Sequence, residues 1–217
     1  MKLWSNSFGN DTPIPGAFAF AVTDPASHIA LSTNRNPHLA WSELPAGTQS
    51  LAVICVDPDV PSVGDDVNQA GRTIPNDLPR VDFFHWVLID LLPGIHEIQA
   101  GEYSFEVTPR GKPGPDVPNG ARQGLNDYTG WFAGDDTMAG DYFGYDGACP
   151  PWNDERIHRY VFTLYALDVP KLDVQGKFTG QEALQHMVGH ILGQASLTGF
   201  YSLNQGIAHK LGTDSGR

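Results

Sequence analysis

Two long apolar runs stand out along the chain and predict core β-strands. The first covers residues 51–59 and the second covers residues 83–90, and both are rich in β-branched and aromatic side chains. Runs with few polar interruptions that stop near Pro or Gly are typical of strands buried on both faces. If the two strands pair antiparallel, the end of the first lies beside the start of the second. Asp57 and His85 are then expected to meet at one rim of a sheet.

A third strand and one helix are predicted in the second half of the chain. Residues 158–167 alternate so that every second side chain can face the same core. Residues 179–195 place apolar side chains at helical spacing, and Thr179 and Glu182 have the spacing of a capping box. We therefore expect a helix over 179–195 that covers the sheet.

The other segments are rich in turn residues and predict short strands and loops. Residues 17–22 indicate a strand, and residues 34–41 indicate a turn followed by a strand. Residues 62–82 have no clear period and are interpreted as a long surface loop, either a wall or lid of the rim or a tolerated insertion. Residues 111–151 are irregular, and their aromatic rings must pack on the sheet, which is the usual outcome, or around a ligand.

Length and composition are those of a globular protein. The 217 residues suffice for one large domain, and 41% hydrophobic with 11% aromatic residues exclude a disordered chain. No apolar stretch approaches the roughly 18 residues of a membrane span. We expect a single domain over residues 1–210 and a disordered tail over 211–217. The first residues lack the apolar segment of a secretory signal, which favours a cytoplasmic location.

Charge and cysteine usage narrow the classes of partner. The formal net charge of -12 disfavours nucleic acid and anionic membrane surfaces, so a bound anion must be held by local donors. Cys55 and Cys149 have neither metal-ligand spacing nor the pattern of a disulfide framework, and both are expected to be free thiols. His28 and His38 are isolated and are expected at the surface or in turns.

Two constellations of polar residues are candidates for chemistry. Asp57 and His85 either form a polar pocket over the sheet or serve as a turn cap and a core histidine, and an isolated Asp/His pair favours the second interpretation. Glu182, His186 and His190 are spaced by four and could in principle bind a metal. No fourth ligand is evident, and such a stripe is usually a solvated helix face, so we predict no metal and no cofactor.

The order of several short motifs is more specific than any one of them. The motifs are Asp57-Pro58-Asp59-Val60-Pro61, His85 at the start of a strand, Cys149-Pro150-Pro151 and His158-Arg159-Tyr160. In this order the chain resembles the phosphatidylethanolamine-binding protein (PEBP) family. Residues 36–41 and 189–201 resemble its bacterial YbhB/YbcL, or Raf kinase inhibitor-like, branch.

The resemblance implies a mainly β fold and a small binding pocket. The fold is a β-sandwich with a large antiparallel sheet and one or two peripheral helices, and the pocket accepts phosphate-like or carboxylate-like groups. Carried over by position, the polar members of the pocket are Asp57, Asp59, His85 and His158, and its walls are Val60, the Cys149 backbone, Pro151 and Tyr160. Cys149 stands where the family usually has glycine, which narrows the pocket or leaves a thiol at its edge. The branch also implies a homodimer.

The function expected from these residues is the binding of a small anion such as phosphate, phosphoethanolamine or a carboxylate. Since Asp57 opposes an anion, binding is expected to tighten as the histidines gain protons. An alternative is a hydrolase or isomerase with His85 or His158 as general base, for which Cys149 is the one candidate nucleophile. A third interpretation, by analogy with the branch name, is an inhibitor that acts through contact with a partner protein.

Overall fold

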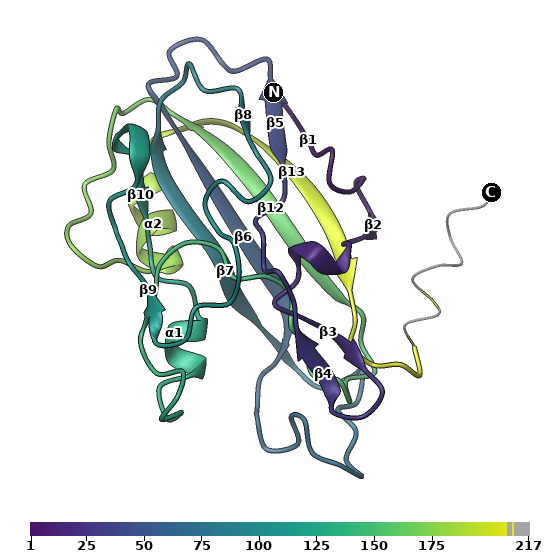
Figure 1. Ribbon diagram of the computed structural model, residues 1–217. Coiled ribbons are helices and arrows are strands. Elements are labelled where there is room, and N and C mark those ends of the chain that lie inside the picture. Colours follow the sequence, from purple (N-terminus) through teal and green to yellow (C-terminus); the bar gives the residue numbers. More distant parts are fainter. Residues whose placement is uncertain (208–209, 211–217) are drawn as a thin grey trace.

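The computed structural model describes residues 1–207 and residue 210, so the tail predicted over 211–217 lies outside the described residues (Figure 1). Its centre is a six-stranded sheet with the order β10-β7-β6-β12-β13-β2. The strands are β10 (Arg122–Gln123), β7 (Arg80–Leu91), β6 (Ser50–Pro61), β12 (His158–Leu167), β13 (Ile191–Tyr201) and β2 (Thr12–Pro13). Neighbouring strands are antiparallel except for β13 and β2. The pairing predicted between the first two apolar runs is confirmed.

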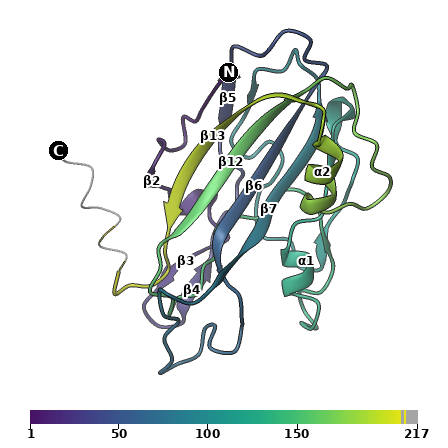
Figure 2. The ribbon, with the colours of Figure 1, turned by 180° about the vertical axis from the view of Figure 1, so that it is seen from behind.

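Smaller elements cover the two faces of this sheet. The smaller sheets are β1 (Lys2–Trp4), β5 (Leu39–Ser42) and β8 (Glu97–Ile98); β3 (Ala21–Asp24) and β4 (His28–Leu31); and β9 (Gly111–Lys112) and β11 (Asp141–Tyr142). The helices are α1 (Tyr128–Trp131), α2 (Gly180–Met187), η1 (Gly16–Phe18) and η2 (Pro118–Gly120). Figure 2 shows α2 on the face opposite to the β1-β5-β8 sheet. The mainly β sandwich is therefore confirmed, and none of the described helices is both long and apolar enough to cross a bilayer.

The central strands are apolar along their length because both of their faces are buried. On one face the core contains Val53, Cys55, Trp86, Leu88 and Phe162. On the other face it contains Ala52, Ile54, Val87, Ile89, Ala183 and Met187, the last two from α2. Successive side chains of a strand point to opposite faces, so a strand between two cores needs no polar alternation.

The predicted helix over 179–195 is wrong in its second half. Its capping box is present, since the Thr179 hydroxyl accepts from the Glu182 N–H and the Glu182 carboxylate accepts from the Thr179 N–H. The helix ends at Met187, because Gly189 adopts a left-handed conformation with φ of +87° and turns the chain into β13. The residues at 191–195 that continue the helical spacing belong to that strand.

The early helix end also separates the three residues weighed as a metal site. Glu182 and His186 lie on α2, whereas His190 follows the helix and its Nδ1 lies 2.8 Å from Asp168 Oδ1. Within residues 1–207 and 210, no group of three or more His, Cys, Asp or Glu residues is placed to hold a metal ion.

Two other local predictions need correction. Residues 17–22 do not form one strand, because η1 occupies residues 16–18 and β3 begins only at Ala21. His38 is buried rather than at the surface: its Nδ1 accepts from the Asn6 N–H at 3.1 Å, and its Nε2 lies 3.3 Å from Glu97 Oε2. His28 is exposed, as predicted, at the first residue of β4.

Candidate functional site

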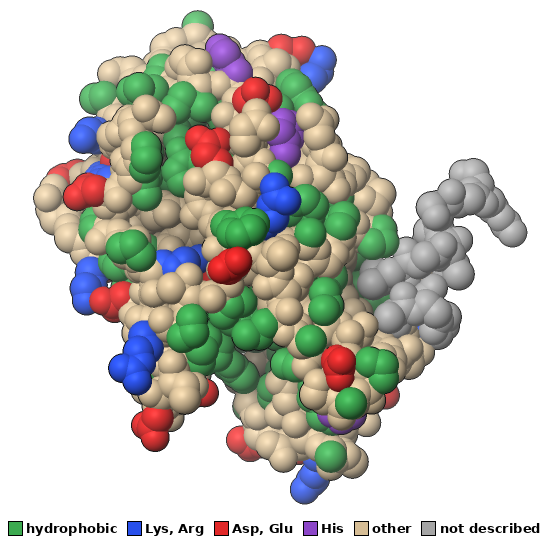
Figure 3. Space-filling view, in the orientation of Figure 1, with side chains coloured by type: hydrophobic (Ala, Val, Ile, Leu, Met, Phe, Trp, Pro, Cys, Tyr) green, Lys and Arg blue, Asp and Glu red, His purple; other side chains and the backbone are tan. Residues whose placement is uncertain are grey.

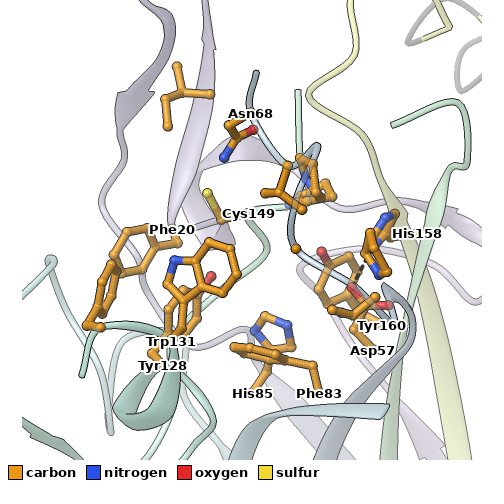
Figure 4. A pocket seen from close by; sticks show the side chains of 18 of the residues that line it. Phe20, Asp57, Asn68, Phe83, His85, Tyr128, Trp131, Cys149, His158 and Tyr160 are labelled. Atoms are coloured by element: carbon orange, nitrogen blue, oxygen red, sulfur yellow. Dashed lines mark hydrogen bonds and ion pairs between the residues drawn. The ribbon is translucent and has the colours of Figure 1, made fainter. Parts of the chain in front are cut away.

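Three neighbouring strands bring the predicted polar residues to one rim of the main sheet. Asp57 of β6 pairs with Phe83 of β7, two residues before His85. On the other side of β6, Val56 pairs with Val161, which places Asp57 next to Tyr160 of β12. Figure 4 shows the Asp57, His85 and Tyr160 side chains around one pocket, so the meeting of Asp57 with His85 is confirmed.

The Asp57 carboxylate is fixed by the turn that follows it. Its Oδ1 accepts from the Asp59 N–H at 2.8 Å, which is the local turn bond that Asp side chains favour. The β6–β7 register shifts between Asp57 and Val60, and such irregularities commonly re-aim side chains near sites. The strand alternation therefore breaks at the point where the polar residues lie.

A buried chain of alternating charges extends from Asp57 away from the pocket. His158 is fully buried, with Nδ1 2.7 Å from Asp57 Oδ2 and Nε2 3.1 Å from Asp154 Oδ2. Arg80 in turn donates to both oxygens of Asp154, at 2.5 and 3.1 Å. Neither Arg80 nor Asp154 was predicted as part of the site, because no local pattern links them.

This chain of charges determines the protonation state of His158. Burial opposes the charged imidazolium, but attraction to Asp57 and the hydrogen bond to Asp154 outweigh it and raise the pKa of His158 to about 9. Because both ring nitrogens are occupied, His158 orients and balances the charge of Asp57 rather than offering a donor to a ligand. It lines the pocket as predicted, but neither of its ring nitrogens is free to bind a ligand.

His85 differs from His158 in its charge and in having a ring nitrogen that no protein group occupies. Its Nδ1 donates to the Asp146 carbonyl oxygen at 2.7 Å, which leaves Nε2 as the ring nitrogen directed to a ligand. Burial lowers the pKa of His85 below its ordinary value, with Asp57 acting against this shift. The side chain of Asp146 is itself held by Asn34 and Asn126, at 2.7 Å each. At neutral pH, His85 therefore presents a neutral acceptor nitrogen to the pocket.

Tyr160 contributes a buried hydroxyl beside the Asp57 carboxylate, to which it makes at most a poorly aligned hydrogen bond. Its residue is 2% exposed, and the hydroxyl has no well-aligned hydrogen-bond partner within the described part of the chain. Burial and the neighbouring Asp57 raise the pKa of Tyr160 well above its usual value, so the hydroxyl keeps its proton. Sequence analysis assigned Tyr160 to a wall, whereas the geometry makes it a polar group of the site.

Asp59 does not face the pocket, which corrects its assignment as a polar pocket member. Its oxygens accept from the Arg159 guanidinium at 2.8 and 3.0 Å and from Arg156 at 3.2 Å. Although burial opposes the charged carboxylate, the Arg159 hydrogen bonds lower the pKa of Asp59. Its function in the structure is to attach the turn to the start of β12.

The pocket is a cavity of about 500 Å³ whose walls are mostly apolar. Val60, Cys149 and Pro151 line it as predicted. Gly64, Val67 and Asn68 also line it, so the loop between β6 and β7, over residues 62–79, forms a wall, one of the alternatives left open for this segment. The apolar residues that sequence analysis missed are Phe20, Ile29, Leu31, Phe83, Tyr128, Trp131, Phe132 and Met138. For those after residue 111, the one signal was the number of aromatic rings in the irregular 111–151 segment, and no signal pointed to the others.

Both cysteines are free thiols, as predicted. Burial raises the pKa of Cys149 to about 12, so its sulfur stays protonated at neutral pH. It narrows the cavity as a small apolar group.

The structure thus defines a mainly β protein, an antiparallel sandwich with a pocket at the rim of its main sheet. The family model described as phosphatidylethanolamine-binding protein matches residues 4–202. The chain belongs to this family, in its YbhB/YbcL branch.

Similarity to known proteins over most of the chain supports this assignment. The chain is 31% identical to the UPF0098 protein YbhB of Escherichia coli over 169 residues, which is 78% of this chain and 82% of that protein. It is 32% identical to a UPF0098 protein of Methanothermobacter thermautotrophicus over 177 residues, 82% of this chain and 89% of that protein. A solved putative PEBP homologue from Chlamydia trachomatis superposes with a TM-score of 0.61 at 27% identity, covering 93% and 96% of the two chains.

Proposed function

We propose that the chain is a ligand-binding protein that holds a small polar head group at the Asp57 end of the cavity. The observation that carries this proposal is the unused capacity of three groups there: the Asp57 carboxylate, the His85 Nε2 and the Tyr160 hydroxyl. A buried polar atom without a partner costs about 1–3 kcal/mol. A ligand that hydrogen-bonds to the Tyr160 hydroxyl removes this cost when it binds.

Among the head groups predicted from sequence, phosphoethanolamine fits these groups best. The site offers a carboxylate and a neutral imidazole as acceptors and one hydroxyl as donor, and no Lys or Arg of the described residues lines the cavity. An ammonium group pairs with Asp57, and the phosphate accepts from Tyr160. Plain phosphate or a carboxylate is opposed by Asp57 until His85 gains a proton, which the lowered pKa of His85 delays to acidic pH.

The state of Cys149 supports binding rather than nucleophilic catalysis. A thiol with a pKa of about 12 supplies almost no thiolate at neutral pH. A hydrolase or isomerase would then depend on His85 alone as general base. Turnover of a phosphoester that disappears in His85→Gln would favour that alternative.

The test is calorimetric titration with phosphoethanolamine at pH 7.5, comparing wild type with Tyr160→Phe. This substitution removes only a hydroxyl that has no well-aligned hydrogen-bond partner in the described protein, so we expect the fold to be retained. A lost hydrogen bond to a charged group predicts affinity about 10- to 100-fold weaker. Tyr165→Phe, on the same strand and outside the cavity lining, is the matched control and should bind like wild type. Equal binding by wild type and Tyr160→Phe would overturn the proposal.

A further inference from the structure

We infer that the ligand carries an aromatic body besides its polar head, and that this body lies in the apolar part of the same cavity. The ligand class is a small arylalkyl molecule whose head donates hydrogen bonds, such as an ammonium group. The inference rests on the proposed function, because the head is taken to lie at Asp57 and Tyr160. It goes further in assigning a use to the mostly apolar part of the cavity away from Asp57.

The cavity is much larger than a head group needs. Its volume of about 500 Å³ lies within the range of about 300–1,000 Å³ typical of sites for drug-sized molecules. At about 30 Å³ per water molecule, this volume is equivalent to about 17 waters. A phosphate or phosphoethanolamine fills a small part of this space, while a phospholipid with two long acyl chains exceeds it.

The walls of the additional space are aromatic and are continuous with the head-group end. Tyr128 connects the two parts: its ring packs edge to face against His85 at 5.6 Å and stacks on Phe132 at 5.5 Å. Phe20 stacks on Tyr128 at 4.7 Å and also contacts Phe132 at 6.0 Å, and Phe83 meets Tyr128 edge-on at 5.2 Å. Rings prefer stacked and edge-to-face neighbours, so this lining suits an aromatic guest.

The mouth of the cavity leaves large apolar side chains in water. Leu31 of β4 is 64% exposed and Trp131 of α1 is 53% exposed, and both line the cavity. Figure 3 shows hydrophobic side chains along a hollow in the lower part of the molecule, and Figure 4 shows Trp131 above Tyr128. Apolar groups gathered at a cavity mouth indicate a binding surface that a ligand covers.

The charges of the cavity select the head of this molecule. Asp57 is the one carboxylate among the described lining residues, and no cationic Lys or Arg accompanies it. The chain as a whole carries a net charge of -12, which attracts cations and repels anions. An ammonium or hydroxyl head is therefore favoured over a carboxylate on the same aromatic body.

The experiment compares 2-phenylethylamine with ethylamine, two probes with the same head of which only the first has an aromatic body. Calorimetry or NMR titration at pH 7.5 should show 2-phenylethylamine binding about 10- to 100-fold tighter, the gain from burying one aromatic group. Trp131→Ala should weaken 2-phenylethylamine about tenfold. Trp4→Ala is the matched control, because Trp4 is 43% exposed and does not line the cavity, and it should bind like wild type.

Tyr160→Phe separates this inference from the proposed function, because the ammonium head of either amine would donate to the Tyr160 hydroxyl oxygen. Loss of 2-phenylethylamine affinity in both Tyr160→Phe and Trp131→Ala supports a head and a body in one cavity. If the two amines bind with equal affinity and Tyr160→Phe weakens both, the head-group site is supported. The inference of an aromatic body is then wrong. If 2-phenylethylamine binds tightly and Tyr160→Phe leaves its affinity unchanged, the placement of the head beside Tyr160 is wrong. Absence of any 2-phenylethylamine binding would also overturn the inference.

Discussion

The raised pKa of His158 predicts that the protein loses stability as the pH rises above neutral. In the unfolded chain a histidine has a pKa of about 6.5, whereas in the folded protein the pKa of His158 is raised to about 9. Its folded-state pKa is the higher one, so the stabilisation is fully present below about pH 6.5 and is lost as the pH rises through 9. At about 1.4 kcal/mol per pH unit, the contribution of His158 is on the order of 3 kcal/mol.

The assay is urea unfolding between pH 6.5 and 9.5, with the free energy of unfolding compared between wild type and variants. We expect a decrease of about 3 kcal/mol in wild type and most of this decrease to disappear in His158→Gln. His96→Gln, which changes an exposed histidine, is the control and should keep the wild-type slope. Because His158→Gln leaves the buried Asp57 without its cationic partner, a direct NMR titration of the wild-type imidazole serves as the second measurement. An imidazole that titrates near pH 6.5, or slopes that do not differ, would refute the reasoning.

Further predictions concern pH, reactivity, the helix cap and assembly. Plain phosphate should bind more tightly at pH 6 than at pH 8 by calorimetry, and His85→Gln should abolish this difference because His85 supplies the proton. Iodoacetamide at pH 8 should alkylate Cys149 at least 100-fold more slowly than free cysteine, since a pKa of about 12 leaves little thiolate; equal rates by mass spectrometry would contradict this. Thr179→Ala should lower the free energy of unfolding by about 1 kcal/mol in urea titrations, through loss of the capping bond, and an unchanged value would show that the cap does not contribute. Sedimentation should give a homodimer, and a monomer at all concentrations would contradict the expectation from the branch.

The central strands and the meeting of Asp57 with His85 were predictable because they depend on patterns local to each strand. Continuous apolar runs indicate strands with two buried faces, and antiparallel pairing then fixes which strand ends lie together. The register confirms this, with Asp57 opposite Phe83.

The parts that could not be predicted depend on long-range contacts or on a local irregularity. Regular alternation would place Asp59 on the same face as Asp57, but the register shift after Asp57 leaves Asp59 bound to Arg159. His38 is buried because Asn6 and Glu97, distant in sequence, supply its partners. No short motif indicates contacts of this kind.

The helix end was predicted wrongly and the apolar part of the cavity was not predicted, for different reasons. Gly189 marks the end of α2, but the apolar residues beyond it happen to continue the helical spacing. The cavity wall is formed in part by β4, the loop over 62–79 and the segment around α1. Each contributes only one to a few side chains, so no single segment contains a readable pattern.

The most direct test of the head-group site is an NMR titration of the protein with phosphoethanolamine at pH 7.5. We expect the largest chemical-shift changes on the His85 and Tyr160 rings, with smaller changes in the turn that follows Asp57. Asp82→Asn, which removes an exposed carboxylate of the same strand as His85, should leave the pattern unchanged. Changes confined to residues away from this rim, or no changes at saturating ligand, would contradict the account.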